Sequence, residues 1–198
     1  MTSEQLKKIR AYASREAVPI LQDETGEFIC NYIKEHNVKT VLEIGTAIGY
    51  SSIKFAAVRD DIKVTTIELD IDRHLTAVEN IKLAGYSDRI NAIHADALLY
   101  DSGSQKFDLI FIDAAKAQYI KFFEKYKENL APDGVIISDN LSFHGMVADL
   151  SLTHNYSTKK LVKKIQKYVA FLKENQEFHT DFFETGDGIS VSKKIINE

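Results

Sequence analysis

Oxygen-bearing side chains follow two apolar clusters in the middle of the chain, in an arrangement that suits a divalent cation. Asp113 follows the cluster Phe107–Ile112, and Asp139 and Asn140 follow Gly134–Ser138. If these clusters are neighbouring parallel strands, their carboxyl ends meet at one edge of the sheet and the three side chains converge. Carboxylate and amide oxygens are the ligands that Mg²⁺ and Ca²⁺ prefer. We therefore predict a divalent-cation site at Asp113, Asp139 and Asn140, although each residue alone could instead cap a helix.

A lysine that follows the first of these acids could take part in the chemistry. Lys116 lies three residues after Asp113 and is expected to point toward the same cavity. Desolvation and a nearby cation both favour the neutral amine of a lysine. A neutral amine can accept a proton from a reacting hydroxyl. The sequence thus predicts that Lys116 is a general base.

A glycine loop joins the first apolar cluster to a helical segment. In Val41–Ser51 the glycines Gly45 and Gly49 have the spacing G-x-x-x-G. Dinucleotide-binding loops have G-x-G-x-x-G instead, with an extra glycine beside the pyrophosphate. Glu43 would also repel a phosphate and could accept hydrogen bonds from an ammonium group. The loop therefore indicates a ligand without a pyrophosphate, or else a purely structural turn.

Acidic residues after the next two clusters indicate a nucleoside. Glu68 ends the second cluster, about 20 positions beyond the glycine loop, where an acid can bind both ribose hydroxyls. Asp96 and Ala97 follow the third cluster and are expected beside the base of the nucleoside. Glu68 could alternatively be an ordinary acid at the start of a helix, as Asp70 can be.

Five short clusters rich in β-branched residues predict strands that are covered on both faces. They span Thr40–Ile44, Lys63–Ile67, Ile90–His94, Phe107–Ile112 and Gly134–Ser138. Helical periodicity lies between them, and one such segment has Leu75, Val78 and Ile81 on one face. The alternation predicts right-handed βαβ crossovers and an α/β, Rossmann-like fold: a mostly parallel sheet with helices on both faces.

The two ends of the chain depart from this alternation. Residues 3–36 predict two helices, and the C-terminal segment predicts a helix followed by a hairpin of Phe178–Glu184 and Ile189–Lys193. The glycines of Thr185–Gly188 can adopt the positive φ that a tight turn requires. This antiparallel hairpin brings the predicted sheet to seven strands, and the nucleotide-binding half of a dehydrogenase does not usually end in this way.

The composition is that of a globular protein in a reducing compartment. The 198 residues carry a net charge of −4 and are 44% hydrophobic, enough for a sizeable core. Cys30 is the one cysteine, and neither a signal peptide nor a membrane-spanning stretch is recognisable. We predict a cytoplasmic protein, not inserted in a membrane, with a single domain over residues 1–198 whose residues 1–36 form helices that cover the site.

A predicted helix near residues 158–174 carries four lysines on one face. They are Lys160, Lys163, Lys164 and Lys167. The opposite face is apolar, so the lysines lie on the exposed side of an amphipathic helix. Such a face is most simply explained by solvation. It could instead bind a phosphate backbone, which lysines contact without reading sequence.

Taken together, these motifs resemble the cation-dependent O-methyltransferases related to catechol and caffeoyl-CoA methyltransferases. The resemblance extends over nearly the whole chain and rests on VLEIGTAIGYSS, the Glu68 turn, FIDAAK, SDN and GDGISVSKK. The longer segments LEIGTAIGYS, FIDAAKAQY, SDNLSFHGMVA and GDGISVS are similar to the bacterial branch that methylates 5-hydroxyuridine at the wobble position of tRNA. The resemblance implies a Rossmann-like methyltransferase fold, a homodimer, and tRNA as the substrate.

The resemblance also implies a role for each matching residue. Lys116 takes the position of the family's base, and Mg²⁺ is expected at Asp113, Asp139 and Asn140. Glu184 falls where catechol methyltransferase has a glutamate that binds substrate. S-adenosylmethionine (SAM) is expected at Glu43, Gly45, Tyr50, Ser51, Glu68, Asp96, Ala97 and Asp113.

Three alternatives remain open at the level of sequence. The same chemistry could act on small catechol-like phenols, which the net charge of −4 favours over RNA. A dinucleotide-dependent oxidoreductase is disfavoured by the glycine spacing and by Asp139 and Asn140. A non-catalytic RNA-binding module would have no need of Lys116 beside a metal.

His144 follows the predicted cation site and could be a surface histidine or a substrate contact.

Overall fold

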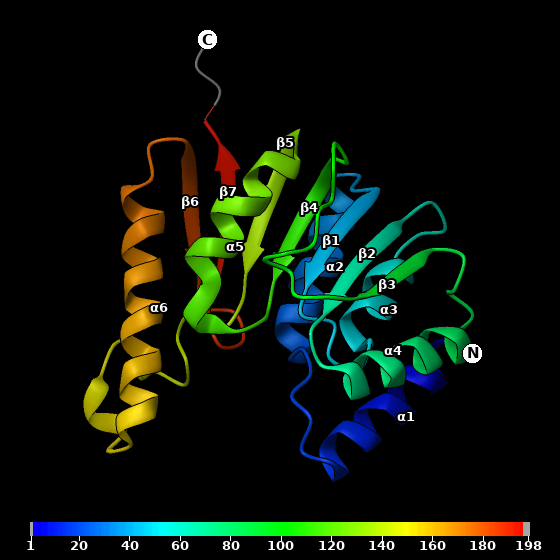
Figure 1. Ribbon diagram of the computed structural model, residues 1–198, viewed down its shortest axis with the longest axis horizontal. Helices are drawn as coiled ribbons and strands as arrows, with labels where there is room; N and C mark the ends of the chain where they lie inside the picture. Colours follow the sequence, from blue (N-terminus) through cyan, green and yellow to red (C-terminus); the bar gives the residue numbers. More distant parts are fainter. Residues whose placement is uncertain (1, 196–198) are drawn as a thin grey trace. The chain divides into compact units, whose positions relative to one another are not determined.

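The computed structural model describes residues 2–195, which form two compact units (Figure 1). The first unit ends at Gly103, and the second begins at Ser104. The candidate site residues are divided between them, so each unit is described by itself. None of the described helices combines the length and the apolar character needed to span a membrane.

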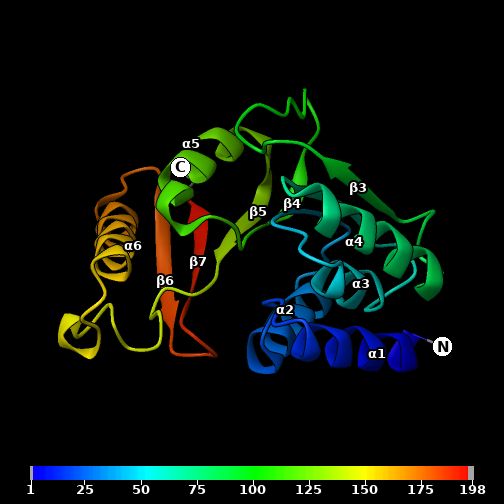
Figure 2. The same ribbon diagram turned by 60° about the horizontal axis from the view of Figure 1, so that its bottom comes forward.

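The first unit is a three-stranded parallel sheet with four helices. Its strands lie in the order β3-β2-β1, with Glu43 opposite Thr66 and Glu68 opposite His94. Helix α3 packs against α1, α2 and α4 (Figure 2). The elements are α1 (Thr2–Arg15), α2 (Asp23–Glu35), β1 (Thr40–Ile44), α3 (Tyr50–Ala56), β2 (Lys63–Glu68), α4 (Ile71–Ala84) and β3 (Ile90–His94).

Helix α4 buries a different face from the one that its large apolar residues indicate. Ile81 is buried as expected, but Leu75 and Val78 are 58% and 42% exposed. The buried face also contains the small residues Ala77 and Ala84. A Cβ on Gly49 would lie 3.4 Å from Ala77, so small residues on both sides allow the helix to approach the glycine loop closely.

The second unit is a four-stranded mixed sheet in the order β4-β5-β7-β6. Strands β4 and β5 are parallel, whereas β7 is antiparallel to both β5 and β6. Helix α6 packs against α5 and β6. The elements are β4 (Phe107–Ile112), the 3-10 helix η1 (Lys116–Gln118), α5 (Tyr119–Tyr126), η2 (Lys127–Asn129), β5 (Leu130–Ser138), η3 (Leu150–Leu152), α6 (Tyr156–Glu174), β6 (Phe178–Phe183) and β7 (Ile189–Lys194).

Strand β5 begins earlier than the sequence pattern indicates. It starts at Leu130, whereas we predicted the strand from Gly134 onward. The ladder is irregular here, because Phe107 pairs with Leu130 while Leu109 pairs with Val135. Strand β5 therefore includes residues on both sides of the irregularity, whereas the apolar pattern covers only the residues from Gly134 onward.

An aromatic cluster joins the helices of the second unit to its sheet. The ring of Phe123 in α5 lies 5.4 Å from Phe171 in α6 and 5.0 Å from Phe178 in β6, measured between ring centroids. Tyr168 in α6 is completely enclosed, which raises the pKa of its phenol. Its hydroxyl lies 2.7 Å from the Ser138 hydroxyl. The cluster therefore supports the end of β5, next to Asp139.

The predicted fold class is confirmed in the described residues. They contain seven strands, whose pairings are parallel except for those of the C-terminal hairpin. Strands β1, β3 and β4 have the predicted bounds, and β2, β6 and β7 differ by one residue. The alternation of strands and helices along the chain therefore predicted the right architecture. The prediction of one domain over residues 1–198 stays a prediction.

Candidate functional site

The glycine loop of the first unit is held onto the end of β2 by backbone hydrogen bonds. The N–H groups of Gly45 and Thr46 donate to the carbonyl of Ile67, over 3.0 and 3.3 Å. Gly45 has φ = 103° and Gly49 has φ = 85°, in the region that favours glycine. The loop thus turns sharply between β1 and α3, as the spacing predicted.

Glu43 is fully buried beneath this loop. Its Oε2 accepts hydrogen bonds from the hydroxyls of Ser52 and Thr66, the latter over 2.7 Å. The Thr66 hydroxyl also lies 2.6 Å from that of Thr46. The carboxyl group therefore links β1, β2 and α3. Its predicted contact with a cofactor amine stays a prediction.

Glu68 links the glycine loop to the segment that follows β2. Its Oε2 accepts a hydrogen bond from the N–H of Ala47 over 2.8 Å, and its Oε1 accepts one from Asp70 over 3.0 Å. The residue is 8% exposed. Each carboxylate oxygen has a second lone pair. Glu68 is therefore fixed in place and can still accept hydrogen bonds from two ligand hydroxyls.

The segment after β3 turns at the same edge of the sheet. The N–H of Ala95 donates to the Glu68 carbonyl over 2.9 Å, which joins the two strand ends. Asp96 is held by Leu98, whose N–H donates to its Oδ1 over 2.8 Å. Leu69 and Leu99 are largely exposed near these acids. Neither leucine was predicted as a site residue. The feature of the sequence that could have indicated them is that each lies close to one of the predicted acids.

Tyr50 and Ser51 begin α3 directly after the loop, and both are buried. The Tyr50 hydroxyl accepts a hydrogen bond from Arg10 of α1, whose guanidinium also pairs with Asp23 of α2. A cavity of about 280 Å³ lies beside Arg10 and Asp23, and both residues line it. The N-terminal helices therefore contact one of the predicted SAM residues.

The second unit brings the predicted cation ligands together. The Nδ2 of Asn140 donates to Asp113 Oδ1 over 3.2 Å, and Lys116 Nζ lies 3.9 Å from the same oxygen. Asp139 is buried, and its Oδ1 accepts the N–H of Asn140 over 2.7 Å. The Tyr119 hydroxyl donates to the Asp139 carbonyl over 3.1 Å. The three predicted cation ligands and Lys116 thus lie in one cluster.

The electrostatics of this cluster favour a positive partner. Burial, followed by the proximity of Asp113, raises the pKa of Asp139 to about 7. Burial likewise raises the pKa of Asp113, although Lys116 opposes that shift. Two carboxylates that share a buried site are costly to ionise together. A cation between them would offset this cost.

The donor set fits a hard cation, with one adjustment. Among the described residues no group of three or more His, Cys, Asp or Glu side chains could hold a metal. The candidate donors are instead two carboxylates and the amide of Asn140. The amide nitrogen faces Asp113. A half-turn of the amide would present its oxygen, giving three oxygen ligands of the kind that Mg²⁺ uses.

The chain after Asn140 adopts an unusual backbone conformation. Asn140, Phe143 and His144 have φ values of 62°, 48° and 57°, which are uncommon for residues with a side chain. The His144 ring is exposed, with Nδ1 3.8 Å from Asp187 Oδ2. Asp187 was not predicted as a site residue, because the sequence analysis treated the turn that contains it only as a hairpin connection. Glu184 is exposed directly after β6.

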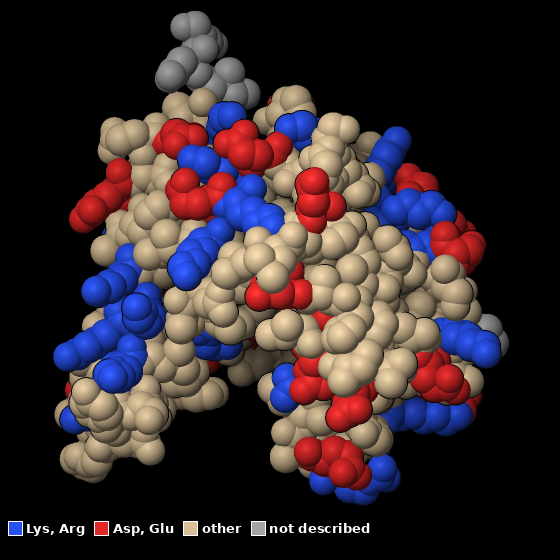
Figure 3. Space-filling model, in the orientation of Figure 1, with Lys and Arg blue, Asp and Glu red and all other residues tan. Residues whose placement is uncertain are grey.

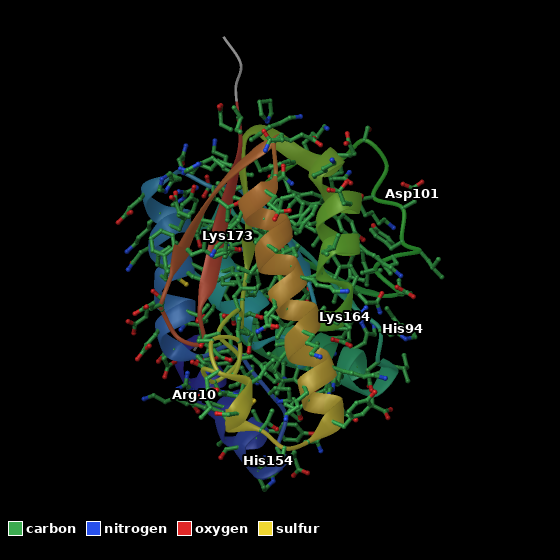
Figure 4. All side chains as sticks on the ribbon, turned by 90° about the vertical axis from the view of Figure 1, so that its left-hand side faces the viewer. Arg10, His94, Asp101, His154, Lys164 and Lys173 are labelled. Atoms are coloured by element: carbon green, nitrogen blue, oxygen red, sulfur yellow. The ribbon has the colours of Figure 1, made fainter. Side chains whose placement is uncertain are left out.

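The predicted lysine face is present on α6. Lys160, Lys163, Lys164 and Lys167 are exposed, and Ile165 and Tyr168 on the other side are buried. Figure 4 labels Lys164 on this helix. Figure 3 shows Lys and Arg side chains gathered over this helix. The helix contains six lysines and one glutamate. In the part of the chain that the structure describes, none of the four lysines forms an ion pair with an acid.

Comparisons with known proteins agree on one family. The sequence model of a family described as O-methyltransferase matches residues 1–195. A caffeoyl-CoA O-methyltransferase of Populus kitakamiensis is 28% identical over 205 residues, covering 97% of this chain and 87% of the relative. A solved structure from Staphylococcus aureus, described provisionally as a caffeoyl-CoA O-methyltransferase, has a TM-score of 0.92 and 38% identity, covering 96% of this chain and 91% of that one.

A further structural neighbour shows the same fold with a ligand. The O-methyltransferase from Bacillus cereus, solved in complex with SAH, has a TM-score of 0.82. It is 23% identical and covers 97% of this chain and 91% of its own. The predicted Rossmann-like methyltransferase fold is therefore shared with solved O-methyltransferases.

Proposed function

Because this chain belongs to the O-methyltransferase family, we propose that it transfers the methyl group of SAM, with a divalent cation, to a hydroxyl beside a second oxygen. The family match confirms the predicted enzyme class and favours methyl transfer over an oxidoreductase or a non-catalytic RNA-binding module. The observation that carries the finer proposal is the cluster of Asp113, Asp139 and Asn140 with Lys116 beside it.

The first unit is proposed to bind SAM. Glu68 would accept hydrogen bonds from the ribose hydroxyls, since one of its oxygens is fixed by Ala47 of the glycine loop and the other by Asp70. Asp96 and Ala97 would lie at the adenine, where the exposed Leu69 and Leu99 offer apolar contact. The SAH-bound neighbour of the same fold supports this choice of cofactor. Glu43, Gly45, Tyr50 and Ser51 complete the proposed set in this unit, and the predicted contact of Asp113 with SAM stays a prediction.

The second unit is proposed to bind the cation, Mg²⁺ or a similar ion, through Asp113, Asp139 and Asn140. When bound, the cation would hold two neighbouring oxygens of the acceptor and lower the pKa of its hydroxyl. Lys116 would accept the hydroxyl proton. Its Nζ lies 3.9 Å from Asp113 Oδ1, which places the amine beside the proposed cation ligands.

The methyl transfer itself requires alignment rather than further acid or base. The deprotonated oxygen attacks the methyl carbon in line with the carbon–sulfur bond, at a distance of about 3 Å. The carbon–oxygen bond forms as the carbon–sulfur bond breaks, and SAH leaves as a neutral thioether. The chain's task is therefore to orient both partners and to remove one proton.

We propose 5-hydroxyuridine at the wobble position of tRNA as the acceptor, which gives 5-methoxyuridine. Its C5 hydroxyl and O4 carbonyl are neighbouring oxygens, as the cation site requires. The exposed lysines of α6 support a polyanionic substrate. Small catechol-like phenols are the second candidate, favoured by the net charge of −4 and by relatives named for caffeoyl-CoA. A cytoplasmic location and a homodimer are part of the same proposal.

The test is transfer of labelled methyl from SAM to tRNA that carries 5-hydroxyuridine, run beside caffeic acid and other catechols. Unmodified tRNA of the same sequence is the matched control. We expect label in the hydroxylated tRNA far above the control and the phenols. Label in the phenols alone would overturn the RNA substrate while keeping the enzyme class.

A further inference from the structure

We propose that Asp187 is a positioning residue that fixes the segment 140–145, and through it Asn140. The role assigned to Asn140 rests on the proposed cation site. Asp187 belongs to the turn Thr185–Gly188, which joins β6 to β7. The proposal gives this turn a part in the chemistry beyond closing the hairpin.

The turn and the segment are joined by backbone hydrogen bonds. The N–H of Leu141 donates to the Gly188 carbonyl over 2.8 Å, and the N–H of Ser142 donates to the Asp187 carbonyl over 2.7 Å. Gly188 has φ = 80°, and a Cβ at this position would lie 2.9 Å from the Ser142 nitrogen. The residue type at Gly188 therefore permits the close approach that these bonds require.

The side chain of Asp187 adds a contact that the backbone cannot make. It is 6% exposed, and its Oδ1 accepts the N–H of His144 over 2.5 Å. His144 and Phe143 both have positive φ, and Ser142 Oγ accepts the N–H of Gly145 over 3.0 Å. An unfavourable backbone conformation persists only where its surroundings hold it. The Asp187 carboxylate is one of the groups that hold it.

The held segment begins at a proposed cation ligand. Asn140 itself has φ = 62°, and its N–H donates to Asp139 Oδ1. Only Leu141 to Phe143 separate it from His144. If the His144 amide were released, the segment could relax toward ordinary backbone angles, and the Asn140 amide would turn away from Asp113.

Asp187 could alternatively act through its negative charge rather than through the hydrogen bond to His144. In the described part of the molecule, Asp187 Oδ2 is buried without a hydrogen-bond partner, and the His144 ring lies beyond hydrogen-bonding distance. Asp187 could therefore act through its charge. The two roles separate in Asp187→Asn, which keeps an oxygen acceptor for the His144 N–H and loses the charge.

The experiment compares Asp187→Asn with Asp187→Ala in the full-length chain. Hydrogen exchange at the His144 amide is measured by NMR, and Mn²⁺ binding is measured by calorimetry. We expect Asp187→Ala to speed the exchange and weaken Mn²⁺ binding, each about tenfold, because one buried hydrogen bond is lost. Asp187→Asn should keep both close to the wild type. Asp181→Ala, at an exposed position of β6, is the control and should change neither.

Different failures have different meanings. Unchanged exchange at His144 in Asp187→Ala would overturn the positioning role, as would Mn²⁺ binding weakened equally by the Asn and Ala variants. Absence of Mn²⁺ binding by the wild type would instead overturn the proposed cation site, and the exchange data would still decide the role of Asp187. Thermal unfolding shows whether each variant is folded, and SAH binding should be the same in all of them, because Asp187 is not among the proposed SAM residues.

Discussion

Glu43 and Glu68 end neighbouring strands, yet their carboxyl groups have different surroundings. The Glu43 carboxyl group is fully buried and accepts hydrogen bonds from the hydroxyls of Ser52 and Thr66, whereas that of Glu68 accepts the backbone N–H groups of Ala47 and Asp70. Both were predicted to bind a ligand, because the spacing of residues shows where a strand ends. Spacing does not show how deeply a side chain at that end is buried. The same limit applies to Asp187, whose neighbours come from a distant part of the chain.

The buried position of Glu43 makes Thr66 important for stability. Thr66→Val keeps the shape of the side chain and removes the hydroxyl that donates to Glu43 over 2.7 Å. Loss of a hydrogen bond to a buried polar group costs about 1 to 3 kcal/mol. We expect a decrease of that size in the free energy of unfolding, measured in urea. Thr76→Val is the matched control, because its hydroxyl donates to the Asp72 carbonyl of its own helix. An equal loss in both variants would contradict the role given to Glu43.

The thiol of Cys30 gives a test by pH. Burial raises the pKa of Cys30 above its ordinary value, and the thiolate is the reactive form. At pH 8 the folded protein therefore holds less thiolate than a free cysteine. We expect slow alkylation by iodoacetamide at pH 8 and a rate that still rises above pH 9. A rate at pH 8 equal to that of the urea-unfolded chain would contradict the burial of this side chain.

The apolar pattern predicted that helix α4 and strand β5 exist, but it did not predict the buried face of α4 or the first residue of β5. Leu75 and Val78 suggested the buried face of α4, but the small residues Ala77 and Ala84 are buried instead, and Ala77 lies close to Gly49 of the glycine loop. Strand β5 starts at Leu130 because of a ladder irregularity that an apolar pattern does not contain. Helix α6 follows its predicted faces, since its polar and apolar residues are cleanly separated.

The lysine face of α6 is tested by a pair of matched variants. Lys163→Gln with Lys164→Gln removes two exposed charges from this face, and Lys7→Gln with Lys82→Gln removes two from the first unit. Lost phosphate contacts weaken binding and lower its salt dependence by about one unit per contact. We expect a higher KM for tRNA in the α6 variant alone, with transfer to phenols unchanged. Equal effects of the two pairs would show that α6 has no specific part in binding RNA.

At the scale of the whole molecule, the fold was predictable because it follows from the alternation of strands and helices along the chain. Composition shows no linker near Gly103, where the first compact unit ends, and the prediction of a single domain stays a prediction. Cation ligands at the ends of β4 and β5 were brought together as expected from parallel strands. The acceptor and the homodimer depend on surfaces and partners, so they stay predictions.

The central claim is that the second unit binds a cation which methyl transfer requires. The most direct measurement is methyl transfer by the wild type with Mg²⁺ or with chelator, beside Asp139→Ala with Mg²⁺, while SAH binding is followed by calorimetry. We predict that chelator and Asp139→Ala each abolish transfer and leave SAH binding largely intact, because the proposed cofactor contacts of the first unit are unchanged. Full activity in chelator would contradict the account.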